Sequence, residues 1–467
     1  MSLPNDIASL QILVMELLKR VEDLEAENKQ LKAIINSNSS NSSKPPSSDG
    51  LKKKPALPRN KSKKRGGQKG HKGKTLEMVK QPDHIVELCP LKCLCGTSLL
   101  NTEKTCKNIR QVFDLPQPRL EVTEYQQQSC TCPGCGKTNV GQFPQGIAPN
   151  AQYGSGVRGL VTLLNISYKI PFKKIKTLFS DLYGYALNES TQINTLNKCH
   201  DLLEVSENQI KDQLLKSQVN HFDETGLRVA GKLNWLHNCS NELYTYLFVH
   251  ASRGKKALAD SVSLLPFYKG WAIHDCWPTY FKFDQCNHAL CGSHLLRELQ
   301  ALIDQKSIWA EKMHRLLLDI YKFTDKGKSI LKESKKFIRK YVRICKMADQ
   351  EEPPPIIKPR GGRSKRTKGR NLYDRLVKHQ DAVLAFALHP FIPFTNNLAE
   401  RDVRHAKIKQ KIAGSFRTVK GAKTYARIYG FISTLRKHQL HKEDLNLNIF
   451  KELKAVFDGK NFNLSYD

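Results

Sequence analysis

A short apolar run that ends in a polar turn occupies residues 219–226, Val219-Asn220-His221-Phe222-Asp223-Glu224-Thr225-Gly226. A run of this length between turn signals is typical of a buried β-strand. A second short apolar run, Gly270-Trp271-Ala272-Ile273-His274, is followed directly by Asp275. Because both acids end or follow predicted strands, where side chains of adjacent strands converge, we expect Asp223 and Asp275 to lie close together.

A third carboxylate, Glu400, lies in the stretch Asn396-Asn397-Leu398-Ala399-Glu400-Arg401, which has the character of a helix start. We expect the Asn396 or Asn397 side chain to cap this helix and Gly414 to end it. At 3.6 residues per turn, one face of the helix carries Glu400 and a row of cations. These cations are Arg404, Lys407 and Lys411.

Three acids on a very basic chain predict phosphoryl transfer on a nucleic acid. Mg²⁺ prefers oxygen ligands and keeps positions open for water and phosphate. Two such ions about 4 Å apart can activate a nucleophile and stabilise a leaving oxygen at a phosphodiester. We therefore predict that Asp223, Asp275 and Glu400 hold Mg²⁺ or Mn²⁺.

Composition supports a polyanionic partner. The chain has 467 residues, a formal charge of +32 and 39% hydrophobic residues, which allows a sizeable core and about three domains. DNA or another nucleic acid is the commonest partner for such a charge. An anionic membrane is the rival, but no apolar run of about 18 residues or more is present. The N-terminus lacks the features of a secretory signal, so we expect a soluble cytoplasmic protein.

Seven of the 13 cysteines lie between Cys89 and Cys135, and this crowding favours a metal over disulfides. Cys132-Pro133-Gly134-Cys135-Gly136 has the form of a zinc knuckle, and Cys93-Leu94-Cys95-Gly96 is an irregular second half. We predict a structural Zn²⁺ held by Cys93, Cys95, Cys132 and Cys135. Cys89 is an alternative to Cys93, Cys130 is a further candidate, and unpaired structural cysteines are the competing interpretation.

A second group of metal-ligand residue types is Cys286, His288, Cys291 and His294, for which we favour structural roles over a metal site. His294 begins a helix, where it could contact phosphate or orient the nearby acid. We expect His221 and His274 to be core residues, or neighbours that support the acids, rather than metal ligands.

The N-terminal residues 7–35 carry a heptad repeat with β-branched residues at one seam position and Leu at the other, a pattern typical of a parallel dimer. Asn28 falls on the β-branched position, where a buried amide fixes register. A surface helix packed on its own domain is the alternative. The seam residues are Ile7, Leu10, Val14, Leu17, Val21, Leu24, Asn28, Leu31 and Ile35.

Residues 36–74 are rich in Ser, Asn, Pro, Gly and Lys and contain almost no apolar side chains, which predicts disorder. Lys63, Lys64 and Arg65 belong to a basic run that is either a solvated tail or an arm that binds the DNA backbone. Strands are expected at residues 219–222, 233–238, 243–249 and 271–273, and helices at 150–215, from 295 past 342, around Glu400 and in the tail.

Motifs along most of the chain resemble those of the insertion-sequence-66 family of transposases, a branch of the DDE transposases. The resemblance rests on Asp223-Glu224-Thr225-Gly226, His274-Asp275, His294-Leu295-Leu296-Arg297-Glu298-Leu299, and Asn396-Asn397-Leu398-Ala399-Glu400-Arg401 with Gly414-Ser415-Phe416-Arg417. It extends to Ser42–Gly50, Gly66–His71, Arg110–Pro116 and the Cys132 knuckle. Cys276 stands where the family has a small residue.

This resemblance implies an α/β fold with an RNase H-like catalytic core and a helical insertion between the second and third acids. It also implies Mg²⁺-dependent cleavage at transposon ends and joining to target DNA in a bacterial, nucleoid-associated setting. We expect homodimers or larger assemblies through the coiled coil, and other proteins of the same element as further partners. The residues expected to contact DNA are Lys63, Lys64, Arg65, Arg404, Lys407, Lys411 and Arg417.

We predict eight segments. The first four are a coiled coil at 1–36, a disordered basic linker at 37–80, a zinc-binding domain that binds DNA at 81–148 and a helical domain at 149–216. The other four are the first part of the core at 217–294, a helical insertion with a basic loop at 295–390, the third-acid helix of the core at 391–420 and a helical tail at 421–467. The alternative function is a catalytically inactive, sequence-specific DNA-binding regulator derived from such an enzyme. A structural coiled-coil scaffold is a third interpretation, but it leaves the charge and the acids unexplained.

Overall fold

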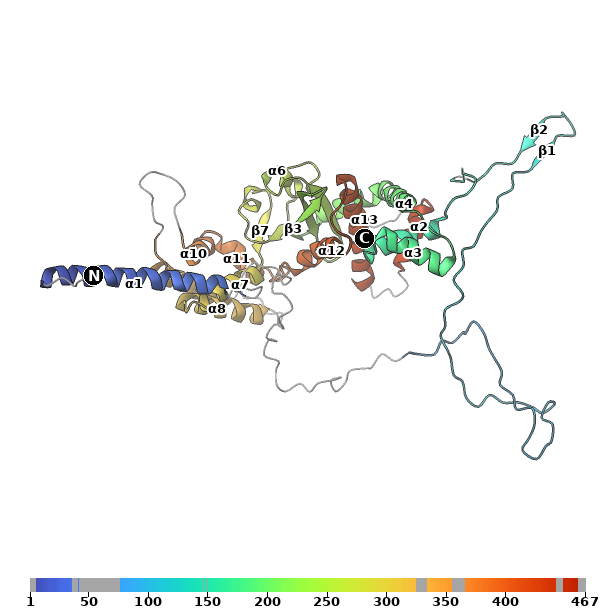
Figure 1. Ribbon diagram of the computed structural model, residues 1–467, viewed down its shortest axis with the longest axis horizontal. Coiled ribbons are helices and arrows are strands. Elements are labelled where there is room, and N and C mark those ends of the chain that lie inside the picture. The colour runs from blue at the N-terminus through green and yellow to red at the C-terminus, as the bar shows by residue number, and fades with distance from the viewer. Residues whose placement is uncertain are drawn as a thin grey trace. The chain divides into compact units, whose positions relative to one another are not determined.

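The computed structural model describes residues 6–35, 41, 76–144, 146–147, 149–324, 334–354, 366–441 and 448–460 (Figure 1). The chain divides into two compact units, Met1–Gly50 with Gln126–Asp467, and Leu51–Tyr125. The basic residues Lys63, Lys64 and Arg65 lie outside the described residues. Within the described part, no helix is both long enough and apolar enough to cross a bilayer.

The larger unit is a mixed α/β structure built on a five-stranded sheet with the order β5-β4-β3-β6-β7. Strands β3, β4 and β5 pair antiparallel, whereas β3–β6 and β6–β7 are parallel. The strands of this sheet are β3 Val219–Val229, β4 Lys232–Ser240, β5 Thr245–His250, β6 Trp271–His274 and β7 Asn287–Leu290. A separate hairpin joins β1 Ser129–Thr131 to β2 Thr138–Val140.

Helices surround the sheet in three groups along the chain (Figure 1). Before it come α2 Ser155–Thr162, the π-helical turn η2 Leu163–Ser167, α3 Phe172–Tyr183, α4 Glu189–Leu202 and α5 Glu204–Lys216. Within and after it come α6 Lys255–Leu258, η3 Leu265–Phe267, η4 Tyr280–Lys282, α7 Gly292–Ile303, α8 Ile308–Thr324, α9 Ser334–Glu351, α10 Lys368–Lys378 and α11 Gln380–Leu388. The last group is α12 Asn397–Ala413, α13 Val419–His441 and α14 Ile449–Phe457. Helix α1, Ile7–Ile35, covers the predicted heptads.

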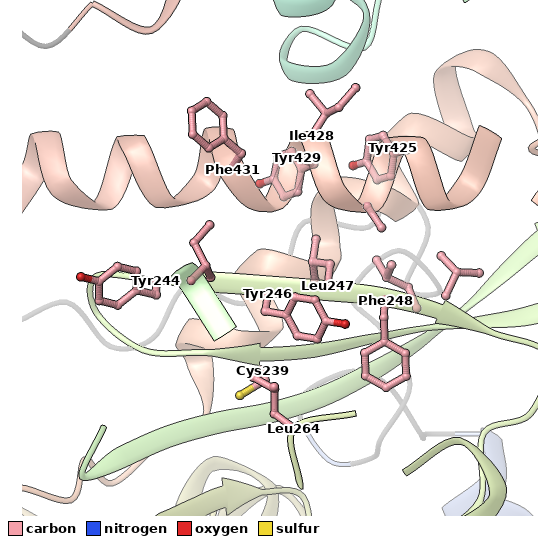
Figure 2. Packing of buried hydrophobic residues seen from close by; sticks show 14 of the residues in the cluster. Cys239, Tyr244, Tyr246, Leu247, Phe248, Leu264, Tyr425, Ile428, Tyr429 and Phe431 are labelled. Carbon is pink, nitrogen blue, oxygen red and sulfur yellow. The ribbon is translucent and has the colours of Figure 1, made fainter. Parts of the chain in front are cut away.

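The largest apolar core lies between α13 and the antiparallel part of the sheet (Figure 2). Tyr425, Ile428 and Phe431 of α13 are buried in the same cluster as Tyr246 and Leu247 of β5. A second core joins β6 and β7 to α7–α11, so the helices between the second and third acids have an apolar centre of their own. The helical insertion predicted from the sequence therefore packs against one edge of the sheet.

The first strand is longer than the sequence pattern suggested. We expected it to end at Phe222, but β3 continues to Val229, so Asp223 lies inside the strand. The reason is a tight hairpin at Ala230 and Gly231, whose positive φ angles of 48° and 75° match a two-residue turn with the twist of the flanking strands. The polar residues after Phe222 pair with β4 and are kept extended by that ladder.

Strand β7 was not predicted, because its residues Asn287–Leu290 were read as part of a group of metal-ligand residue types. Its parallel pairing with β6 explains the pattern, since Ala289 and Leu290 are buried at the sheet edge. The helices predicted for 150–215 and from 295 onward are present, and Gly184 ends α3 at a φ of 73°.

Candidate active site

Strand pairing brings the first two acids together. The parallel register sets His221 opposite Ile273, so two residues further along Asp223 comes opposite Asp275, directly beyond the end of β6. The Asp275 carboxylate accepts a hydrogen bond of 3.2 Å from the backbone N–H of Trp277. This arrangement fits the expected meeting of the two side chains.

Asp223 is the electrostatic centre of the site. Its pKa is raised well above the ordinary value, first by burial, then by the charges of Glu224 and Asp275, and to a smaller extent by Glu400. The backbone N–H of Glu224 donates a 2.9 Å hydrogen bond to the Asp223 carboxylate, and this bond lowers the pKa of Asp223. Asp275 and Glu400 therefore both lie within electrostatic range of Asp223.

Glu400 lies in the first turn of α12, where the sequence placed it. Its Oε1 atom is 3.7 Å from Nδ1 of His294 and 3.6 Å from a terminal nitrogen of Arg297, both on α7. Neither Glu400 Oε1 nor His294 Nδ1 has a hydrogen-bond partner among the described residues, although both atoms are buried. Oε1 of Glu400 is thus buried from solvent and can still accept a hydrogen bond or bind a cation.

Cys291 completes a small group with these two side chains. One ligand atom each from Cys291, His294 and Glu400 falls within 4.8 Å of the others, a spacing that a metal ion could use. Burial alone would lower the pKa of His294, but the neighbouring Cys291 thiol, with a smaller contribution from Glu400, raises it to about 9. His294 is therefore a cation beside the third acid.

The four residues Cys286, His288, Cys291 and His294, for which we favoured structural roles over a metal site, make separate contacts. His288 contacts His274 at 3.1 Å and the Phe283 carbonyl at 3.0 Å. Burial lowers the pKa of His274 to about 3 and that of His221 to about 4, so both imidazoles are neutral at pH 7. As expected, His221 and His274 are core residues.

Asn396, at the N-cap position of α12, ties the third acid to the first. Its side-chain amide donates to the Phe222 carbonyl at 2.8 Å, its Oδ1 accepts from His221 Nδ1 at 2.8 Å, and its backbone N–H donates to the Cys291 sulfur at 3.1 Å. The side chain makes no cap hydrogen bond to the helix. The predicted capping role is thus wrong for Asn396, because β3 lies close enough to take its side chain.

The sequence analysis missed the role of Glu224. Its Oε1 accepts hydrogen bonds of 2.7 Å from Nε and from a terminal nitrogen of Arg253, and its Oε2 accepts one of 2.5 Å from the Tyr280 hydroxyl. The side chain is only 2% exposed. Because protein groups satisfy both oxygens, Glu224 is a structural neighbour of the acids rather than a free ligand. Its position directly after Asp223 was the one available signal.

The cations predicted to contact DNA on and after α12 are all exposed. They are Arg404, Lys407, Lys411 and Arg417, and Lys407 also donates to the Gly226 carbonyl of β3. Gly414 ends the helix as predicted, with a φ of 77°. After this turn, Phe416 exchanges hydrogen bonds of 3.0 and 2.8 Å with the end of β3, so the segment that carries Arg417 lies along the sheet.

The helical insertion reaches the loop that follows Asp275. Arg375 of α10 donates to Glu298 of α7 at 3.1 Å. The Arg375 guanidinium also lies beside the Cys276 thiol. Burial raises the pKa of Cys276 more than the charge and hydrogen bond of Arg375 lower it, so it is a neutral thiol next to the second acid. The departure from the family pattern at this position leaves the acids in place.

The predicted zinc ligands form two tight turns in separate units. Cys132 and Cys135 lie in the β1–β2 hairpin, where the Gly136 N–H donates to the Cys132 carbonyl at 2.9 Å. In the other unit, Gly96 N–H donates to the Cys93 carbonyl at 2.9 Å. Hydrogen bonds from Thr97, with a smaller one from Cys93, lower the pKa of the Cys95 thiol to about 7. Each turn by itself favours thiolates, and the four-cysteine site stays a prediction.

Taken together, a cluster of carboxylates on a mixed sheet, flanked by exposed cations, defines a class of site suited to divalent cations and phosphate esters. The family described as Transposase IS66 family matches residues 150–424, more than half of the 467 residues. The chain belongs to this family, which confirms the resemblance seen in its motifs and implies DNA as its substrate.

The matched region contains Asp223, Asp275 and Glu400 together with the whole sheet. Residues 2–77, which include α1, match a family of unknown function. No curated protein matches the chain.

Proposed function

We propose that this transposase catalyses Mg²⁺-dependent cleavage at the ends of an insertion sequence and strand transfer into target DNA. The observation that carries the proposal is the parallel pairing of β3 with β6, which puts Asp223 and Asp275 on neighbouring strands, together with the effect on Asp223 of the Glu400 charge from 177 residues away in the sequence. A group of like charges is unfavourable unless a cation offsets it. The five-stranded sheet with Asp223 on its central strand supports the RNase H-like core that the resemblance implies.

The residues present fit a hard divalent cation. Asp223 and Asp275 offer carboxylate oxygens from adjacent strands, and the buried Oε1 of Glu400 has no hydrogen bond within the described part of the chain. Carboxylates are the ligands that Mg²⁺ and Mn²⁺ prefer. When bound at these acids, the metal would supply activation of a water or a 3′-hydroxyl and stabilisation of the leaving oxygen.

The surrounding side chains have separate tasks in this scheme. His294 and Arg297 flank the Glu400 carboxylate from α7, and Arg253 pairs with Glu224, whose charge still adds to the negative potential at Asp223. Arg404, Lys411 and Arg417 are exposed along and beyond α12, where they would contact phosphates of the DNA. Without a covalent intermediate, positioning and electrostatics account for the chemistry.

The decisive experiment is a strand-nicking assay on element-end DNA with Mg²⁺, comparing the wild type with Asp223→Asn. Loss of one carboxylate ligand should reduce the nicking rate by about 10²–10³-fold, since metal stabilisation of transition-state charge contributes several kcal/mol. Asp212→Asn, at an exposed position of α5, is the matched control and should retain full activity. Accompanying element proteins are supplied in every reaction.

Thermal unfolding without divalent metal separates chemistry from folding. Asp223→Asn removes a partly buried charge from among like charges, so it should raise Tm by a few degrees, about 2–4 °C for each kcal/mol. A variant that is folded but inactive supports the enzyme. Equal nicking by the wild type and the variant would instead favour the catalytically inactive, DNA-binding regulator.

A further inference from the structure

We propose that Trp235, Arg253 and Trp277 form a stacking platform for an unpaired base of the DNA strand that enters the acid site. The inference rests on the proposed function and adds a binding site for the substrate beside the carboxylates. Its basis is the contact of one guanidinium with two indole rings. The chain contains only four tryptophans, and two of them contact this arginine.

The geometry of the platform is defined by three contacts. The Arg253 guanidinium carbon lies 4.4 Å from the centroid of the Trp277 ring and 5.1 Å from that of Trp235. Both Nε and a terminal nitrogen of Arg253 are held by Glu224 at 2.7 Å, which fixes the plane of the guanidinium. A planar cation held in this way is pre-organised, so little side-chain entropy is lost when a base stacks on it.

The platform adjoins the acids through the backbone. Trp277 is two residues after Asp275, and its N–H donates to the Asp275 carboxylate at 3.2 Å. Trp235 lies on β4 opposite Gly226 of β3, on the same face of the sheet as Glu224. The platform is therefore joined to the acids through Trp277, and a nucleotide whose phosphate is held at Asp275 would have its base near this ring.

Partial exposure points to a ligand. The Arg253 side chain is 39% exposed although it is paired with a carboxylate that is 2% exposed, and both indole rings are partly exposed. A cluster that served only to hold Glu224 would not need exposed side chains, because buried Trp235, Arg253 and Trp277 could hold it equally well. Aromatic rings beside an arginine bind the faces of unpaired bases with little sequence preference, whereas paired bases in a duplex keep their faces covered.

The test measures binding of end DNA by the full-length chain carrying Asp223→Asn, in Ca²⁺, so that cleavage does not interfere. Two probes are compared, a fully paired duplex end and the same end with three unpaired terminal nucleotides that include 2-aminopurine. Trp277→Leu should weaken binding of the unpaired probe about tenfold or more, as expected for loss of base stacking. Trp277→Phe should restore most of it, and binding of the paired probe should change little.

Phe267→Leu is the matched control, because Phe267 is an aromatic residue with 60% exposure outside the platform. The 2-aminopurine emission should be quenched on binding to the chain with Trp277 intact, which tests stacking even if Trp277→Leu fails to fold. Absence of quenching, equal binding by Trp277→Leu, or an equal loss for both probes would overturn the platform. Base-dependent binding by a wild-type chain that does not nick DNA would overturn the proposed function alone.

Discussion

The side-chain amide of Asn396 donates a 2.8 Å hydrogen bond to the backbone carbonyl of Phe222, the residue that precedes Asp223. This bond joins two segments 174 residues apart in the sequence, the strand of the first acid and the start of the helix of the third. Because Asn396 is 1% exposed and also contacts His221 and Cys291, it fixes where α12 begins relative to the sheet.

We predict that Asn396→Ala uncouples Glu400 from Asp223. The variant leaves the Phe222 carbonyl without its partner, which should cost about 1–3 kcal/mol of stability. It should also weaken Mn²⁺ binding by about 10–100-fold, as removal of groups that orient metal ligands does. Calorimetric titration with Mn²⁺ and a nicking assay measure the effect. Asn397→Ala, at the exposed neighbouring position, is the control and should behave like the wild type.

Lys409 gives a prediction about pH. Its ammonium is 8% exposed and donates to the Asn165 backbone carbonyl and side-chain oxygen, each at 3.0 Å. Burial first, and the charge of Lys169 second, lower its pKa from 10.5 to about 8. Between these two values the unfolded chain binds more protons than the folded one, so this group makes the free energy of unfolding rise with pH from about 8 to 10.5.

Lys409→Met should flatten that rise, by an amount of order 3 kcal/mol across the window at about 1.4 kcal/mol per pKa unit. Urea unfolding at pH 7.5, 8.5 and 9.5, with Lys411→Met as an exposed control on the same helix, measures the difference in slope. A Lys409→Met curve parallel to that of the wild type would show that Lys409 titrates normally.

The exposed seam of α1 predicts self-association. Leu17, Val21 and Leu24 are 54%, 50% and 58% exposed on a 29-residue helix, a large apolar stripe without a partner among the described residues. The heptad pattern favours a second copy of the chain. Leu17→Glu with Leu24→Glu should convert a dimer to a monomer in light scattering, whereas Lys19→Glu, off the seam, should not. A wild-type monomer at micromolar concentration would contradict the prediction.

The cysteine turns predict one bound zinc per chain. Cys132→Ser with Cys135→Ser should remove it, because thiolates that favour zinc then remain only at the Cys93 turn. Metal analysis of purified protein checks the stoichiometry, and Cys106→Ser is the control, since Cys106 is exposed and outside the proposed ligand set. Full zinc content in the double variant would exclude Cys132 and Cys135 as ligands. The same analysis of Cys89→Ser and Cys93→Ser decides which thiol pairs with Cys95.

Local patterns in the sequence determined much of this protein. The heptads predicted the helix α1, Gly414 marked a helix end, and the runs and turns around the three acids singled them out as candidates. These features depend on residues within a few positions of one another, where backbone preferences and side-chain periodicity act directly.

Tertiary structure decided the rest, because it depends on which surfaces meet. Pairing with β4 kept Asp223 within a strand where the local pattern predicted a turn, and β3 diverted the Asn396 side chain from its helix. Arg253 contacts Glu224 from 29 residues away, a pairing that no local signal marks. A buried polar group forms hydrogen bonds with the complementary groups that the folded structure brings within reach. Which groups these are depends on how the sheet and the helices pack together.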